Sequence, residues 1–171
     1  MTQGIDRPTN GASLLRDYIR MATELGQEYE KYPKSLKKEH DITMLNYKVR
    51  QNEMKRKQFE EAVKSEPYKK LEYKKKTYSI ITPEEIQDLI NEGNELSHCV
   101  ASYVDSIVSG RCQILFLRNT EYLDKPLATI EVRGDNVRQA RGFANRALRL
   151  SEREFVAEWA KKKELQLNYY Y

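Results

Sequence analysis

Cysteine and histidine are scarce in this chain of 171 residues, which contains only Cys99, Cys112, His40 and His98. Two cysteines are too few for a small scaffold stapled by disulfides. With only two histidines, a metal centre would have to recruit carboxylates to complete its ligand set. We therefore expect no disulfide framework, no bound metal and no cofactor.

Long apolar runs are also absent, since no segment approaches the ~20 apolar residues that cross a bilayer. The opening residues, MTQGIDRPTNGASLL, do not show the basic and then apolar pattern of a secretory signal. We therefore expect a soluble, cytoplasmic protein with no membrane partner. Its length suits one compact domain with a projecting segment.

The excess positive charge is confined to one stretch of a chain whose net charge is +4. Residues 50–76 contain ten Lys or Arg and five Glu, a local charge of +5, so the rest of the chain sums to −1. Such a stretch suits a phosphate backbone. The residues expected to contact nucleic acid are Lys55, Arg56, Lys57, Lys69, Lys70, Lys74, Lys75 and Lys76. A solvated helix surface with Glu–Lys pairs accounts for the same pattern.

A second basic group contains arginine and no lysine. Its six members are Arg133, Arg138, Arg141, Arg146, Arg149 and Arg153. Because the guanidinium group is a planar fork that matches carboxylate or phosphate, this composition favours geometry-specific pairing over diffuse attraction.

Apolar residues at helical spacing predict helices at residues 14–25 and 97–109, and from residue 151 onward. The residues Thr82-Pro83-Glu84-Glu85 are typical of a helix start and predict a further helix to about residue 93. A longer helix is predicted from Ser35 to Glu66. Its residues 50–58 are almost all polar, so we expect a Lys-rich helix that projects from the domain, with a length of about 48 Å.

Strands are predicted at residues 112–117, 127–132 and 137–141, the last two joined by a turn at 134–136. The fold class is therefore α+β, with helices packed on a small antiparallel sheet. We expect a helical N-terminal region at residues 1–79 and an α+β core domain at residues 80–171.

A three-residue turn at 134–136 would place Glu131 opposite Gln139 and Thr129 opposite Arg141. One face of this hairpin would then be polar. Its carboxylate and guanidinium groups suit either a structural cross-strand pair or a bound ligand.

The segment SHCVASY, residues 97–103, holds the densest set of reactive side chains. The candidate catalytic residues are His98, Cys99, Tyr103 and Glu131. Adjacent helical residues point about 100° apart, so His98 is badly placed to take a proton from Cys99. A buried cysteine beside a hydrogen-bonded histidine is the structural alternative.

The residues RGFANR, 141–146, leave the last strand with a glycine and an asparagine, which expose backbone N–H groups. This loop suits an anion held by Arg141 and Arg146, or a tight connection to the final helix. The full set of candidate ligand-binding residues is Ser102, Thr129, Gln139, Arg141, Gly142, Asn145 and Arg146.

The ordered set ELSHCVASY at 95–103, ILFLR at 114–118, TIEV at 129–132 and QARG at 139–142 resembles the PcfJ-like family. Upstream segments, DYIRMA at 17–22 and YPKSL at 32–36, resemble it as well, so the likeness covers residues 14–165. The resemblance implies a component of conjugative plasmids and phages, without an assigned activity. Ala101 stands where many relatives have glycine, which implies weaker binding if a ligand approaches the backbone there. Relatives are often longer at the N-terminus.

Three functions remain open. The first is a mobile-element accessory protein that binds nucleic acid through its basic helix and arginine-rich face. The second is an enzyme acting on a nucleotide or phosphorylated small molecule at a cleft formed by His98, Glu131 and Arg141. The third is an inhibitor or scaffold that docks a protein partner along the long helix.

Overall fold

The computed structural model describes residues 11–97 and 101–169 and divides the chain into two compact units, Met1–Lys48 and Val49–Tyr171. The first unit contains α1 (Gly11–Glu24) and most of α2 (Leu36–Gln51). Helix α1 buries Tyr18, Met21 and Ala22 on one face. Its last residue, Glu24, accepts a hydrogen bond of 2.6 Å from the Tyr47 hydroxyl in α2, which ties the two helices together.

The prediction of one long helix from Ser35 to Glu66 is wrong, because the chain forms the two helices α2 and α3 there. Helix α3 (Glu53–Val63) starts afresh after Asn52, whose side chain accepts a hydrogen bond of 3.0 Å from the backbone N–H of Lys55. Phe59 and Val63 are then buried as α3 packs against α6. The Lys-rich segment therefore lies on the domain and does not project, because Phe59 and Val63 are covered, although Met54 is exposed.

The second unit contains a six-stranded sheet in the order β1-β2-β3-β4-β5-β6. Its strands are β1 (Tyr73–Lys74), β2 (Tyr78–Ile81), β3 (Gln113–Asn119), β4 (Tyr122–Arg133), β5 (Asn136–Arg141) and β6 (Gln166–Leu167). Its helices, besides α3, are α4 (Glu66–Lys69), α5 (Ile86–Glu95), α6 (Val104–Val108) and α7 (Leu150–Lys162), with short 3-10 helices η1 (Ala101–Tyr103) and η2 (Phe143–Asn145). Neighbouring strands are antiparallel except for β5 and β6, which are parallel. The α+β class is confirmed.

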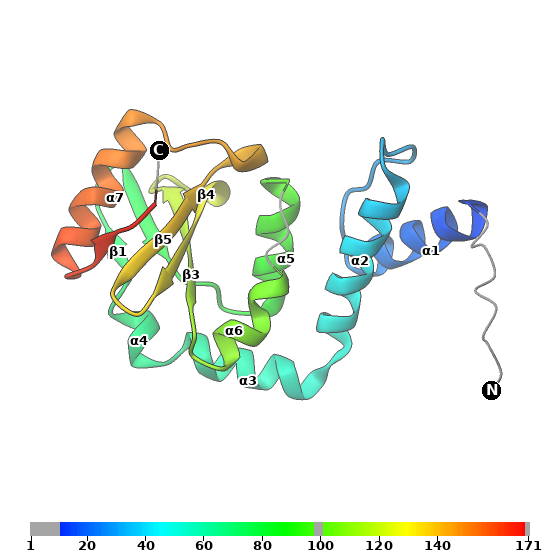
Figure 1. Ribbon diagram of the computed structural model, residues 1–171, viewed down its shortest axis with the longest axis horizontal. Coiled ribbons are helices and arrows are strands. Elements are labelled where there is room, and N and C mark those ends of the chain that lie inside the picture. The colour runs from blue at the N-terminus through cyan, green and yellow to red at the C-terminus, as the bar shows by residue number, and fades with distance from the viewer. Residues whose placement is uncertain (1–10, 98–100, 170–171) are drawn as a thin grey trace. The chain divides into compact units, whose positions relative to one another are not determined.

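The sheet lies between helices on both faces, with α7 on one side and α3, α5 and α6 on the other (Figure 1). On the α7 side, Trp159 is fully buried and its Nε1 donates a hydrogen bond of 2.7 Å to the carbonyl of Leu71. On the other side, the Tyr68 hydroxyl accepts a hydrogen bond of 2.9 Å from the backbone N–H of Ile114. These contacts fix the segment before β1 against the sheet.

The compact unit therefore begins at residue 49, well before the expected boundary at residue 79. Strands β1 and β2 belong to the sheet, and α3 covers part of it, so residues 49–79 fold with the segment that follows them.

The predicted hairpin register is confirmed, although the turn differs. Glu131 pairs with Gln139 and Thr129 pairs with Arg141. Arg133 pairs with Asn136, so the loop has two residues and not three. A β-bulge between Glu131 and Val132 shifts the pairing by one residue and restores the predicted register. Gly134 has a φ of 59°, which glycine adopts readily in such a loop.

Two helix starts differ from the sequence prediction. Helix α5 begins at Ile86, because Asp88 accepts hydrogen bonds from the backbone N–H groups of Glu84 and Glu85 and so caps the helix later than Thr82 would. The helix expected at residues 97–109 is present as η1 and α6, and its residues 98–100 lie outside the described residues. Within the described ranges, no helix combines the length and apolarity that a membrane crossing requires.

Candidate functional site

Two of the predicted catalytic side chains meet between η1 and β4. The Tyr103 hydroxyl donates a hydrogen bond of 2.9 Å to Oε2 of Glu131. Arg133 Nε donates to the other carboxylate oxygen, Oε1, at 2.5 Å. The remaining two candidates, His98 and Cys99, lie outside the described residues. The segment SHCVASY was predicted to approach the polar face of the hairpin. Its last residue, Tyr103, contacts that face directly through Glu131.

Burial controls the chemistry of this cluster. Burial raises the pKa of Tyr103 to about 12, and the hydrogen bond to Glu131 adds to the rise. Burial likewise raises the pKa of the Cys112 thiol to about 11, with a further contribution from the Glu131 charge. Both groups keep their protons at neutral pH, so Cys112 is a core residue here and not a thiolate nucleophile.

The ligand-binding candidates on the sheet are divided between two networks. Gln139 and Arg141 are half-buried on β5, opposite Glu131 and Thr129. The Thr129 hydroxyl donates a hydrogen bond of 3.2 Å to Oε1 of Glu92 in α5, so it belongs to a second network beside the first. Ser102 is exposed on η1.

The loop after β5 is held by an ion pair. Arg146 Nη1 and Nη2 donate to the two carboxylate oxygens of the buried Glu152 at 2.8 and 2.9 Å. An added Cβ at Gly142 would lie 2.6 Å from Cζ of Arg146, so only glycine allows this guanidinium group to approach. Asn145 is exposed, with a φ of 60°. Arg146 therefore has a structural partner where the sequence suggested an anion.

The arginines do not form one free face. Arg133 and Arg146 are paired with glutamates, while Arg138 is exposed on β5. Arg149 is the N-cap residue of α7, and its backbone N–H donates to Glu152 at 2.8 Å. The expected arginine-rich face is therefore distributed over the hairpin, a loop and a helix start.

Sequence reasoning missed a buried ion pair between α5 and β3. Arg118 binds both carboxylate oxygens of Glu92, through Nη1 at 3.1 Å and through Nη2. Burial raises the pKa of Glu92, and the Arg118 guanidinium opposes that rise. Their positions in the sequence were the available signal. Glu92 follows Leu89 by about one helical turn on the buried face of α5, and Arg118 shares with Phe116 one face of a core strand.

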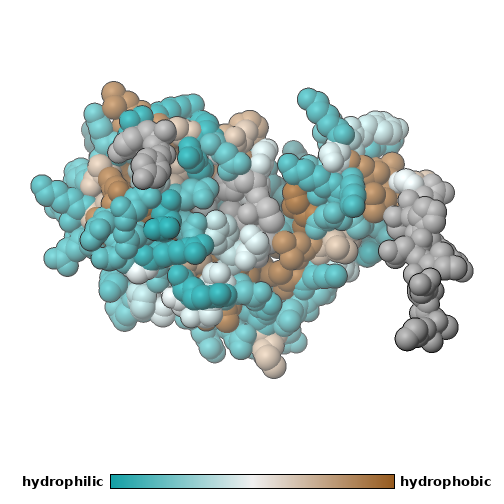
Figure 2. All heavy atoms as spheres, viewed as in Figure 1, coloured by the Kyte–Doolittle hydropathy of each residue, from teal (hydrophilic) through white to brown (hydrophobic). Residues whose placement is uncertain are grey.

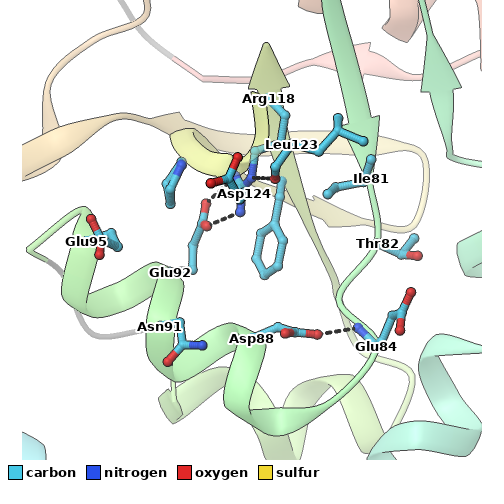
Figure 3. A pocket seen from close by; sticks show the side chains of 12 residues that line it. Ile81, Thr82, Glu84, Asp88, Asn91, Glu92, Glu95, Arg118, Leu123 and Asp124 are labelled. Carbon is cyan, nitrogen blue, oxygen red and sulfur yellow. Dashed lines mark hydrogen bonds and ion pairs between the residues drawn. The ribbon is translucent and has the colours of Figure 1, made fainter. Parts of the chain in front are cut away.

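This ion pair forms the floor of a cavity of about 420 Å³ (Figure 3). Helix α5, strand β2, the connection between them and the β3–β4 hairpin supply its lining. As far as the structure describes the chain, that lining includes neither Glu131 nor Arg141, so the cavity is distinct from the predicted cleft. Among the described residues, no three His, Cys, Asp or Glu side chains are grouped so that they could hold a metal ion.

The basic residues of segment 50–76 are divided between several elements. Arg50 lies in α2, Lys55, Arg56 and Lys57 lie on α3, and Lys64 is the C-cap of α3. Lys55 pairs with Asp105 at 2.6 Å and Lys57 with Glu53 at 3.5 Å. We give the name lysine surface to the lysines of segments 69–76 and 161–163: Lys69, Lys70, Lys74, Lys75, Lys76, Lys161, Lys162 and Lys163.

Contacts between β1 and α7 create the lysine surface. Glu158 of α7 accepts a hydrogen bond of 2.9 Å from the Tyr73 hydroxyl and pairs with Lys75 at 2.5 Å. The Lys163 Nζ lies 5.9 Å from the centre of the Tyr73 ring. Two lysine-rich segments that are more than eighty residues apart in the sequence are thereby brought together.

Comparison with known proteins gives one family and one curated relative. A family model described as PcfJ-like protein matches residues 14–156. An uncharacterized protein of Listeria innocua serovar 6a is 29% identical in an alignment of 150 residues that covers 84% of this chain and 33% of that protein. The chain thus spans a third of the length of this relative. No solved structure matches the chain significantly.

Proposed function

The chain belongs to the PcfJ-like protein family, which suggests a plasmid-associated protein, and on that premise we propose that it is a mobile-element accessory protein that binds nucleic acid through the lysine surface. The observation that supports this proposal most directly is the meeting of two lysine-rich segments at Glu158 and Tyr73. Segments 69–76 and 158–164 contain eight Lys and three Glu, a charge of +5. A concentrated positive surface of this kind attracts a phosphate backbone without regard to base sequence.

The lysine surface is accessible and carries few internal pairs. Seven of its eight lysines are exposed, and Lys163 is half-buried. The surface over α7 is largely hydrophilic in Figure 2. Lysines on an edge strand such as β1 also discourage pairing between sheets of different molecules. Protection of the sheet edge requires only Lys74, which lies on β1. It does not explain the three consecutive lysines at the C-terminal end of α7.

The test is nucleic-acid binding by the full chain, measured by fluorescence anisotropy with single- and double-stranded DNA and RNA at several salt concentrations. The test variant carries Lys76→Gln, Lys161→Gln and Lys162→Gln, all exposed. We expect its affinity to fall at every sequence tested. The slope of log affinity against log salt should become shallower by about 0.9 for each lost contact with a duplex phosphate.

A matched control carries Arg56→Gln, Lys57→Gln and Lys64→Gln, which remove the same charge from α3 and its C-cap. This control should retain most of the affinity and salt slope. An equal loss in both variants would mean that net charge alone attracts the nucleic acid, and no retention by the unmodified chain at low salt would refute the function itself.

The rival functions have less support in the described residues. Of the two guanidinium groups that the sequence suggested for an anion, Arg146 is held by Glu152, which leaves Arg141 alone to bind it. The scaffold hypothesis relied on one long projecting helix, and the break at Asn52 removes that surface.

A further inference from the structure

The cavity above the Glu92–Arg118 pair has an apolar wall and a charged floor. Ile81, Phe116, Leu123 and Pro126 supply the apolar wall. Arg118 lies over the Phe116 ring at 4.7 Å, and its side chain is only 6% exposed. A volume of about 420 Å³ is within the range that holds small organic ligands. The site therefore has the size and wall of a ligand pocket, and its described lining contains none of the eight lysines of the lysine surface.

Carboxylates surround this cavity. Its lining contains five acidic residues and one arginine, a charge of −4, and the arginine is already neutralised by Glu92. The four other acidic residues are Glu84, Asp88, Glu95 and Asp124. None of these four is in an ion pair with any residue that the structure describes. Figure 3 shows Asp88 and Glu95 along α5, with Asp124 on the β3–β4 hairpin.

This charge pattern selects among ligand classes. Phosphates, nucleotides and other anions would be repelled, because Arg118, the only guanidinium group that the described residues contribute to the lining, is paired with Glu92. A single metal ion is also unsuitable, since no three carboxylates among the described residues are close enough to share one. Carboxylates separated around an apolar wall match a ligand with several positive charges joined by hydrocarbon segments.

We propose that this cavity binds an aliphatic polyamine, whose ammonium groups pair with the carboxylates of α5 and the β3–β4 hairpin while its methylene segments lie on Leu123 and Phe116. The bound amine supplies positive charge to carboxylates that have no ion-pair partner among the described residues. The inference does not depend on nucleic-acid binding, because it concerns a different surface with the opposite charge.

Calorimetric titration of the full, nucleic-acid-free chain with spermidine at constant ionic strength tests the proposal. The test variant carries Glu95→Gln and Asp124→Asn, which remove exposed carboxylates from the two elements that border the cavity and leave the Asp88 cap intact. We expect one spermidine per chain and about tenfold weaker binding by the variant, since two partly exposed ion pairs together contribute roughly one factor of ten.

A matched control carries Glu61→Gln and Glu154→Gln, two exposed carboxylates of α3 and α7 that do not line the cavity. It should bind spermidine as the unmodified chain does. A further variant, Leu123→Ser, changes a wall residue that is 43% exposed and should weaken spermidine binding without unfolding the chain.

Three results would overturn the proposal. The first is equal weakening in the control, which would show diffuse attraction to the net charge. The second is displacement of spermidine by Mg²⁺ at matched charge and ionic strength, which would show that the hydrocarbon wall contributes nothing. The third is binding of a lysine-containing peptide without binding of the free amine, which would assign the cavity to a protein partner.

Discussion

At the scale of single residues, the Glu92–Arg118 pair is the most demanding feature of the core. The Glu92 side chain is fully buried and that of Arg118 nearly so, so each relies on the other for compensation of its charge. Taking two charges out of water costs several kcal/mol per ion, which only close hydrogen bonding offsets. The Thr129 hydroxyl adds a further donor to Glu92, which completes the network between α5 and the sheet.

Replacing Glu92→Gln should destabilise the chain by about 3–5 kcal/mol, because it leaves the Arg118 charge buried without a partner. Urea denaturation followed by circular dichroism measures the change. The matched control is Glu95→Gln on the same helix, which should alter stability by less than about 0.5 kcal/mol. If Glu92→Gln does not fold, the double replacement Glu92→Leu with Arg118→Met should restore folding, and its failure would contradict this account.

Glu152 should give stability a dependence on acid pH. Burial opposes ionisation of this group, but the Arg146 guanidinium and the Arg149 backbone N–H outweigh it and lower the pKa of Glu152 below its ordinary value. A carboxyl whose folded pKa is depressed stabilises the fold above its unfolded pKa of about 4.3, and that contribution is lost as pH falls through the folded value.

The variant Glu152→Gln should therefore be less stable at neutral pH and lose less stability on acidification, so that its urea midpoint approaches that of the unmodified chain at low pH. The exposed Glu154→Gln provides the control, and its midpoint should follow the unmodified chain throughout. If the urea midpoints of Glu152→Gln and of the unmodified chain fell in parallel with decreasing pH, the ion pair would not be the cause of the loss of stability in acid. The pKa of Glu92 is raised, so its contribution to the pH dependence of stability has the opposite sign.

At the scale of elements, one cap decides how the Lys-rich segment folds. Asn52 accepts the Lys55 N–H and starts α3, which directs Phe59 and Val63 into the core. Asparagine favours this position because its short side chain reaches the free N–H groups of the first turn. The polar composition of residues 50–58 predicted a projecting helix, but a few apolar residues beyond the cap were enough to dock it.

Replacing Asn52→Ala should cost about 1 kcal/mol of stability, the usual contribution of an N-cap side chain. Urea denaturation measures this change in the free energy of unfolding. Asn52→Asp is the matched variant, since aspartate caps equally well, and it should retain stability. Equal destabilisation by both replacements would show that the side-chain cap does not hold the start of α3.

At the scale of the whole molecule, the second unit carries two surfaces of opposite charge. The lysine surface follows β1 and α7, whereas the acidic cavity lies between α5 and the β3–β4 hairpin. A net charge of +4 conceals this separation, because the two contributions largely cancel in the sum. The two surfaces should consequently act on different ligands.

We expect that each site can be inactivated by substitution without loss of binding at the other. The variant with Glu95→Gln and Asp124→Asn should lose spermidine affinity and keep or slightly raise its affinity for nucleic acid. The variant with Lys76→Gln, Lys161→Gln and Lys162→Gln should show the reverse. Anisotropy and calorimetry on the same preparations give both readouts, and loss of both activities in either variant would show that the sites are not separate.

The α+β class, the strands of the central hairpin and the register that pairs Glu131 with Gln139 could all be predicted from the amino-acid sequence. These follow from local periodicity and turn chemistry, which act over a few residues. The sequence also located the positive charge in residues 50–76, because charge is a property of composition.

Contacts between residues far apart in the sequence depended on how the chain packs in three dimensions. This packing placed Lys75 beside Glu158, paired Arg118 with Glu92 and engaged Arg146 with Glu152. The partner of a charged side chain is chosen by how helices pack on the sheet, and no local pattern records that choice. For this reason the sequence could name charged residues, while only the fold could distinguish those that are paired in the interior from those that face a ligand.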